Sequence, residues 1–182
     1  MADRGGEAAG VAGPVVGLWL FGRPRETREV ITGLLPWLES FCAPVRVRDD
    51  GEVDFRVEDP RALGPAVDAE GTGAFLLTGD EHIPAPDEDY SAFPSPPVQG
   101  LVLAAGSSGP ANHRMLGHLT LALARRLDAL IDFDGMLDAP ELPGLLAQVS
   151  YGADDDGRGL RQVGDAEFLA AWLWQPQFRM IK

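Results

Sequence analysis

Two carboxylates and a histidine are the residues of this chain whose types and spacing best suit catalysis or metal binding. Asp132 and Asp134 alternate with apolar residues in the segment LIDFDG. In a strand, alternate side chains share a face, so both carboxylates lie on one face, roughly 6–7 Å apart. They could bind a divalent cation, or act as the acid and base of a small hydrolase together with the helix histidine His118. The plainer interpretation, which we favour, is that Asp132 pairs with an arginine on the next strand and Asp134 begins a turn.

Two other patterns point only weakly to a ligand. The segment Gly106 to Gly109 precedes an expected helix, where free amide groups attract anions, but it matches neither GxGxxG nor a loop ending in GK[ST]. His113 and His118 are five residues apart, about 140° around a helix axis, whereas one metal ion needs ligands three or four residues apart. With three histidines and one cysteine, no zinc site is expected. We assign no catalytic residue, metal or cofactor.

The charge of the chain restricts its partners. Its 28 Asp and Glu against 15 Lys and Arg give a net charge of −13, which argues against binding to nucleic acid or to an anionic membrane. Acids concentrate in two expected loops: Asp80, Glu81, Asp87, Glu88 and Asp89 in the first, and Asp154, Asp155 and Asp156 in the second. They are either solvated turns or a docking surface for a basic protein.

Composition and termini indicate a cytoplasmic protein. A lone cysteine, Cys42, excludes an internal disulfide and favours a reducing compartment. The first residues carry no basic segment leading into an apolar one, and no apolar run reaches the ~20 residues that cross a bilayer. We expect a disordered tail over residues 1–13, then one domain over 14–182 with an acidic, proline-rich loop at 80–97.

A long amphipathic helix after Gly109 is the most clearly patterned element. Its apolar stripe repeats every three or four residues: Leu116, Leu119, Leu123, Leu127 and Leu130. Ser107 or Ser108 is the expected N-cap, and Pro110 suits the first turn. Gly117 costs roughly 1 kcal/mol against alanine inside a helix, so we expect a neighbouring element to approach it closely.

The segment PVRVRDDGEVDFRVE predicts a β-hairpin whose register can be derived. A three-residue loop, Asp49-Asp50-Gly51, pairs Val47 with Val53, Val45 with Phe55, Arg46 with Asp54 and Arg48 with Glu52. This register gives one apolar face and one face of opposite charges, and it places glycine where such a loop needs a left-handed residue. A two-residue loop would instead place Val47 opposite Asp54.

The remaining patterns complete an α+β fold. Strands are expected at 15–21, 74–79 and 177–182, and a second hairpin flanks the loop at 153–157. A first helix begins at Glu26 or Thr27 and reaches Cys42, with Pro36 kinking or dividing it. Asp165 caps a helix over 166–175, which places Trp172 and Trp174 on opposite sides, one in the core and one exposed as an interface anchor. The result is a mostly antiparallel sheet with two long helices on one face, and the repeated strand–helix–strand order suggests two ferredoxin-like units side by side.

Three segments carry a resemblance to known proteins: VVGLWLFGRPRE, LARRLDALIDFDGML and DAEFLAAWLWQPQFRMIK. Together they resemble a family of uncharacterised proteins of high-GC bacteria, catalogued as a domain of unknown function, over nearly the whole chain after residue 14. The helix leading into IDFDG is also similar to segments of immunity proteins that neutralise polymorphic bacterial toxins. The resemblance implies no site residues. It suggests a cytosolic protein-binding module, such as an immunity-type inhibitor of a basic toxin, with the hydrolase as the alternative.

Overall fold

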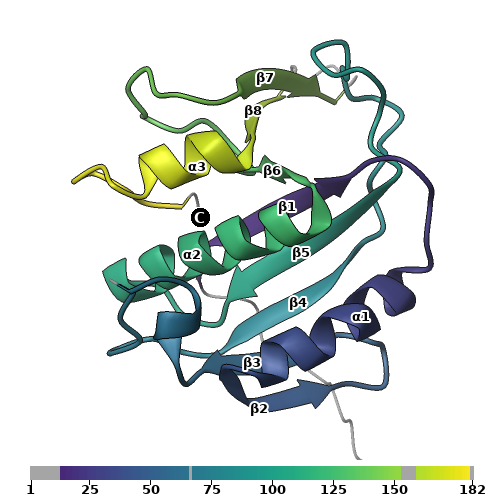
Figure 1. Ribbon diagram of the computed structural model, residues 1–182. Coiled ribbons are helices and arrows are strands. Elements are labelled where there is room, and N and C mark those ends of the chain that lie inside the picture. Colours follow the sequence, from purple (N-terminus) through teal and green to yellow (C-terminus); the bar gives the residue numbers. More distant parts are fainter. Residues whose placement is uncertain (1–12, 66, 153–158, 181–182) are drawn as a thin grey trace, which may run out of the picture.

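An eight-stranded sheet forms the centre of the computed structural model, which describes residues 13–65, 67–152 and 159–180 (Figure 1). Its strands are β1 Val15–Leu20, β2 Cys42–Val47, β3 Val53–Val57, β4 Phe75–Asp80, β5 Gln99–Ala105, β6 Leu130–Asp132, β7 Leu146–Tyr151 and β8 Gly159–Gly164. The helices are α1 Thr27–Glu39, α2 Pro110–Leu127 and α3 Ala166–Trp172, and a 3₁₀ turn spans Pro60–Ala62. The predicted α+β class with an antiparallel sheet is confirmed.

The strand order shows how the two halves of the chain combine. The strand order of the sheet is β2-β3-β4-β5-β1-β6-β8-β7, and within the described residues all neighbouring strands are antiparallel to each other. Strand β1 lies between β5 and β6, which α2 connects. The first half of the chain (β1 to β4) and the second half (β5 to β8) therefore both contain the expected strand–helix–strand order. Their strands interleave within one sheet, because β5 lies between β4 and β1, so the halves do not lie side by side as separate units.

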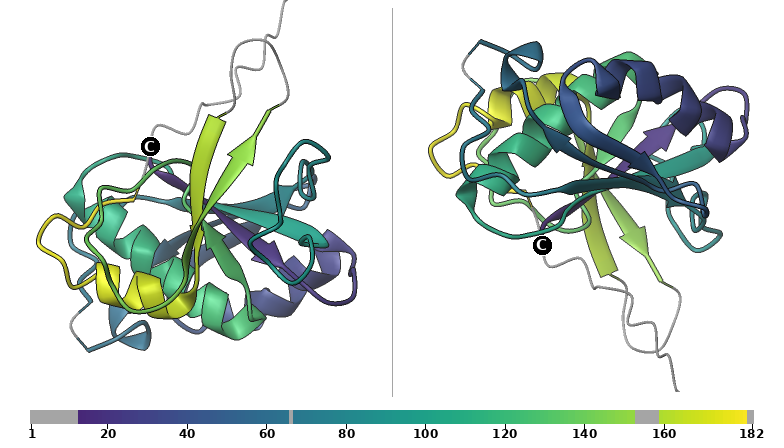
Figure 2. Two further views of the ribbon diagram at one scale, coloured as in Figure 1. Left: turned by 90° about the horizontal axis from the view of Figure 1, so that it is seen from above. Right: turned by 90° about the horizontal axis from the view of Figure 1, so that it is seen from below.

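All three helices lie on the same face of the sheet (Figure 2). Leu34 and Leu38 of α1 and Leu119 and Leu123 of α2 pack into one core with the sheet residues that face them. Both long helices therefore lie on one face, as predicted. The expected stripe of α2 is correct up to Leu123, which is fully buried, but α2 ends at Leu127, which is only half-buried. Leu130 belongs to β6, because Asp128 adopts a left-handed conformation (φ 53°) that ends the helix.

The start of α2 differs from the prediction, whereas its glycine behaves as expected. Gly109 is the N-cap and no serine side chain caps the helix. Ser107 instead accepts a hydrogen bond from Asn112 (3.0 Å), whose Oδ1 accepts from the backbone N–H of Gly73 (2.8 Å). A Cβ at Gly117 would lie 2.6 Å from the Phe178 ring, so the glycine allows the close approach of the C-terminal segment.

The first hairpin has the predicted register. Val45 pairs with Phe55, Arg46 with Asp54 and Val47 with Val53, and the Arg48 N–H donates to the Glu52 carbonyl at 2.8 Å. Gly51 closes the loop with φ 90°. The ion pairs differ from the prediction in one respect, because Arg48 contacts both Glu52 (2.8 Å) and Asp54 (2.7 Å). Arg48 is half exposed, so these pairs contribute little to stability.

The second hairpin is present as predicted, and the capped helix begins as predicted but ends at Trp172 instead of residue 175. Strands β7 and β8 pair, and their connection at 153–158 lies outside the described residues, as do the acids predicted there and almost all of the tail at 1–13. Asp165 accepts a hydrogen bond from the Phe168 N–H (2.8 Å) and caps α3. Pro36 lies inside a continuous α1 and does not divide it. The described part of 177–182 is not a strand, because the Met180 N–H donates to the His113 ring (3.1 Å) and not to a strand neighbour.

Candidate functional site

The acidic loop packs against the sheet and is not merely a solvated turn. Between Asp80 and Gln99 it forms no helix or strand, as predicted. Its residues Ile83 and Phe93 are buried in a second apolar cluster around Trp19. The Trp19 ring meets the ring of Phe93 edge-on, with centroids 5.7 Å apart. Since Leu18 and Leu20 point toward the helices, Trp19 between them points to the opposite face, so the loop covers the sheet on the side away from the helices.

A buried cluster of three charged side chains holds this loop in place. Arg161 of β8 contacts Asp132 of β6 (2.9 Å) and Glu88 of the loop, and only 5–13% of these side chains is exposed. The Arg161 guanidinium also lies 5.2 Å from the ring centroids of both Trp19 and Tyr151. The plainer interpretation of Asp132, a pair with an arginine on the neighbouring strand, is confirmed. Glu88 was expected among the partner-binding residues, but its carboxylate is used inside the molecule.

Burial strongly perturbs the protonation of this cluster. Burial raises the pKa of Asp132 to about 7, with the N–H of Asp134 opposing the shift and the charges of Asp134 and Asp80 adding to it. Burial also lowers the pKa of Arg161, opposed by the charges of Asp80 and Asp87. One oxygen of Glu88 and the Nε of Arg161 are buried without a hydrogen-bond partner among the described residues. The cluster is therefore tightly packed, but not all of its polar atoms have a hydrogen-bond partner among the described residues.

The three residues expected of an enzyme do not come together. Asp134 has φ 55° and donates its backbone N–H to Asp132 (2.9 Å), so it forms the turn that the plainer interpretation predicted. His118 lies on α2, on the helix side of the sheet, whereas Asp132 packs beside Trp19 and Gly17 on the other side. Burial, and then the charge of Arg114, lowers the pKa of His118. Within the described residues, no group of three or more His, Cys, Asp or Glu could hold a metal ion.

Four of the predicted partner-binding acids remain accessible. Glu81, Asp87 and Asp89 are exposed, and Asp80 is partly exposed. Asp87 accepts a hydrogen bond from the Gly152 N–H (3.0 Å), which ties the loop to the end of β7. Asp80 and Glu81 line a hollow of about 280 Å³ together with Glu26, Thr27, Arg28, Ile31, Asp50, Gly51, Thr78 and Gly79. Sequence reasoning missed Glu26 and Asp50, because they come from separate segments that only the fold brings together.

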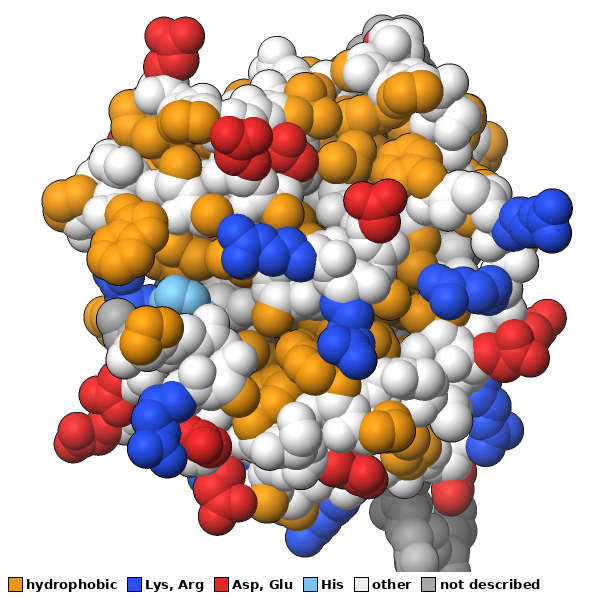
Figure 3. Space-filling view, in the orientation of Figure 1, with side chains coloured by type: hydrophobic (Ala, Val, Ile, Leu, Met, Phe, Trp, Pro, Cys, Tyr) orange, Lys and Arg blue, Asp and Glu red, His pale blue; other side chains and the backbone are white. Residues whose placement is uncertain are grey.

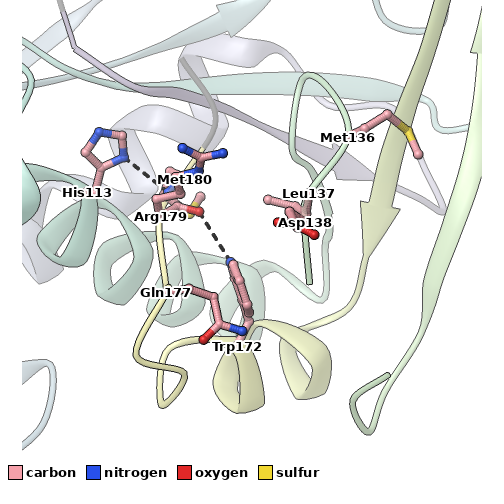
Figure 4. A pocket seen from close by; sticks show the side chains of 8 residues that line it. All are labelled: His113, Met136, Leu137, Asp138, Trp172, Gln177, Arg179 and Met180. Atoms are coloured by element: carbon pink, nitrogen blue, oxygen red, sulfur yellow. Dashed lines mark hydrogen bonds between the residues drawn. The ribbon is translucent and has the colours of Figure 1, made fainter. Parts of the chain in front are cut away.

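A larger pocket of about 570 Å³ lies between the start of α2, the segment at 177–180 and the segment at 136–138 (Figure 4). His113 points toward Met180 and accepts its N–H, and the Trp172 indole donates to the Arg179 carbonyl (3.3 Å). These bonds attach the C-terminal segment to the pocket wall. The polar groups of His113 and Trp172 thus have a structural role, and their arrangement is not that of a nucleophile and its base.

One of the two tryptophans of the C-terminal region is buried and the other is exposed, as predicted, although α3 ends at Trp172 and Trp174 lies just after it. Trp172 is 1% exposed and Trp174 is 81% exposed. Trp174 borders a groove of about 280 Å³ between α2, α3 and the residues after the 3₁₀ turn. We call this the Trp174 groove. Its lining includes Arg114, His118 and Arg125, which the sequence did not link to Trp174.

Comparison with known proteins identifies a family but no function. None of the helices in the described part of the chain is long and apolar enough to cross a membrane. No curated protein and no solved structure matches the chain. Residues 12–182 match a family of unknown function, DUF6368, and this match covers nearly the whole chain. The chain is therefore a member of the DUF6368 family.

Proposed function

We propose that this chain is a protein-binding module that recognises a basic partner through the hollow lined by Glu26, Asp50, Asp80 and Glu81, which we call the acidic hollow. The observation that carries the proposal is this convergence of four acids with only one arginine, Arg28. They come from the start of α1, the β2–β3 turn and the end of β4. The net charge of −13 adds a long-range attraction for a positively charged protein.

The same resemblance that suggests an immunity-type protein also suggests the kind of partner. An inhibitor that covers a basic toxin surface needs accessible carboxylates held on a rigid frame. The end of β4 and the start of α1 provide such a frame, because both are packed on the core through Leu77 and Ile31. A bacterial, cytoplasmic location would accompany this function. The hydrolase alternative receives less support, because Asp132 is paired with Arg161 and lies apart from His118.

The test compares two variants of equal charge. The first, Glu26→Gln/Asp50→Asn/Glu81→Gln, neutralises three exposed acids of the acidic hollow, and the second, Glu39→Gln/Glu70→Gln/Glu141→Gln, neutralises three exposed acids elsewhere. The full-length wild-type chain is used to capture a partner from the native cytosol, and the association rates of the wild type and both variants with that partner are then measured at low and high salt. Opposite charges accelerate association and salt screens them, so the first variant should bind more slowly than the second and show the weaker salt dependence.

Two results would contradict the proposal. In one, both triple variants bind the captured protein at the wild-type rate. In the other, both lose the same fraction of the rate, which would show that net charge alone acts and that the acidic hollow is not the contact surface. Both variants change only exposed side chains, so their melting temperatures should remain close to wild type and report correct folding.

A further inference from the structure

Helix α2 carries positive charge in a chain that is otherwise acidic. Its 18 residues contain three arginines and two histidines and no Asp or Glu. Arg114, His118, Leu121 and Arg125 are spaced four, three and four residues apart, so they form one stripe along the helix. All four line the Trp174 groove. Figure 3 shows basic and apolar side chains across the middle of the helix face, with acidic side chains grouped around them.

The walls of the Trp174 groove are apolar. Pro65 and Val67 form one wall and Leu173 and Trp174 the other. None of the described residues that line the groove is Asp or Glu. A tryptophan that is 81% exposed beside an apolar groove is a typical anchor for a partner, because a large rigid side chain buries much area at a low entropic cost. The groove thus combines an apolar surface with a basic floor.

Both arginines are available to a negatively charged group. Arg114 is exposed, and its guanidinium donates one hydrogen bond to the Leu173 carbonyl (3.0 Å) and lies 5.6 Å from the Phe178 ring centroid. A guanidinium has five N–H donors, so this bond orients the group and leaves donors for a carboxylate. Arg125 is exposed and forms no ion pair within the described residues, although it also lines a neighbouring hollow together with Asp128, Asp165 and Glu167.

The distance between the two arginines indicates the size of the ligand. Eleven residues of helix separate them, which corresponds to about 16 Å along the axis. A small carboxylic acid could reach only one of them. An extended peptide rises by about 3.3 Å per residue, so two acids five residues apart would span the same distance.

We propose that the Trp174 groove binds an extended acidic segment of a partner protein, with two carboxylates about five residues apart and a bulky apolar side chain between them. The carboxylates pair with Arg114 and Arg125, and the apolar side chain packs on Leu121 and Trp174. This surface differs in charge and position from the acidic hollow. The proposal therefore does not depend on the proposed function and can fail separately from it.

The experiment uses a fluorescently labelled hexapeptide, Asp-Ala-Leu-Phe-Ala-Asp, with blocked termini, and measures binding to the full chain by fluorescence anisotropy. The same peptide with Asn in place of both Asp is the ligand control. The protein variants are Arg125→Gln and Trp174→Ala, and the matched control is Arg126→Gln. Arg126 is the next residue on the same helix, but its guanidinium lies over Trp37 (5.4 Å) and outside the groove.

The expected result is specific to the groove. Arg125→Gln and Trp174→Ala should each weaken binding about tenfold, since a charge-assisted hydrogen bond or an interface tryptophan is each worth at least 1.4 kcal/mol. Arg126→Gln and Glu26→Gln/Asp50→Asn/Glu81→Gln should bind like wild type. The Asn peptide should bind at least tenfold more weakly than the Asp peptide.

Four outcomes would overturn the proposal. The wild-type chain could fail to bind the Asp peptide, or Arg125→Gln and Arg126→Gln could weaken binding equally, which would indicate unspecific attraction. Phenylacetate could compete as well as the peptide does, which would make the groove a small-molecule site. Finally, sedimentation could show a dimer that Arg125→Gln dissociates, in which case a second copy of the chain occupies the groove.

Discussion

The buried cluster of Arg161, Asp132 and Glu88 provides the most demanding test of the structure. The change is Arg161→Met, which keeps a long side chain between Trp19 and Tyr151 but removes the charge. The side chains of Asp132 and Glu88 are only 5% and 6% exposed, so both carboxylates would remain buried without their partner. Because burial disfavours a charge that is not compensated, the variant should be strongly destabilised.

The size of the loss follows from the contacts. Removing one partner of a buried ion pair costs about 3–5 kcal/mol. The arginine also loses its contacts with the rings of Trp19 and Tyr151, worth roughly 0.5–2 kcal/mol, but methionine regains about 0.3–1.5 kcal/mol through its own sulfur–aromatic contacts. These two changes nearly cancel. We therefore expect Arg161→Met to lower the free energy of unfolding by about 3–5 kcal/mol.

Urea unfolding above pH 7 measures the loss, and two further variants interpret it. Arg61→Met breaks a surface ion pair between Arg61 and Asp59. Their side chains are 80% and 48% exposed, so this variant should cost far less stability than Arg161→Met. Glu88→Gln/Asp132→Asn/Arg161→Met removes all three charges and should be more stable than Arg161→Met alone. The reasoning fails if Arg161→Met costs no more than Arg61→Met, or if the triple variant is the least stable of the three.

Three further predictions concern pH, the core and the helix contact. The pKa of Asp132 is raised to about 7 in the folded state, above its unfolded value of ~3.9, so its contribution to stability should be complete below the unfolded pKa and be lost as the pH rises through 7. Urea midpoints across this range should show the decline in wild type but not in Asp132→Asn. Leu123→Ala should lower the free energy of unfolding by about 2–5 kcal/mol, because Leu123 is fully buried. Leu127→Ala should cost less, because Leu127 is only half-buried, and equal losses would show that the buried face of the helix is misassigned. Gly117→Ala should lower the melting temperature, because overpacking against Phe178 and Leu173 costs roughly 1–3 kcal/mol and outweighs the helix gain of ~1 kcal/mol; a higher melting temperature would mean that the C-terminal segment moves aside.

Local patterns were sufficient to predict most of the elements. The hairpin register followed from the alternation of side chains and from a glycine that can adopt a positive φ, both of which act within a few residues. The apolar spacing in α2 likewise identified the buried Leu119 and Leu123. Asp165 was recognised as a helix cap because a cap bonds an amide only three residues away. Even the pairing of Asp132 with an arginine on a neighbouring strand could be expected, though not which arginine.

The sites, in contrast, depend on contacts between distant segments. Glu88 and Arg161 are 73 residues apart, and they meet only because β6 lies beside β8 and the acidic loop folds over the face opposite the helices. An acid-rich, proline-rich segment is indistinguishable by composition from a solvated loop, so nothing in the sequence marked Glu88 as the one acid that turns inward. The acidic hollow and the Trp174 groove are each built from at least three segments. The strand order that brings these segments together is decided by the packing of the whole core. Several strand arrangements satisfy each local preference, and only the burial of apolar surface distinguishes between those arrangements.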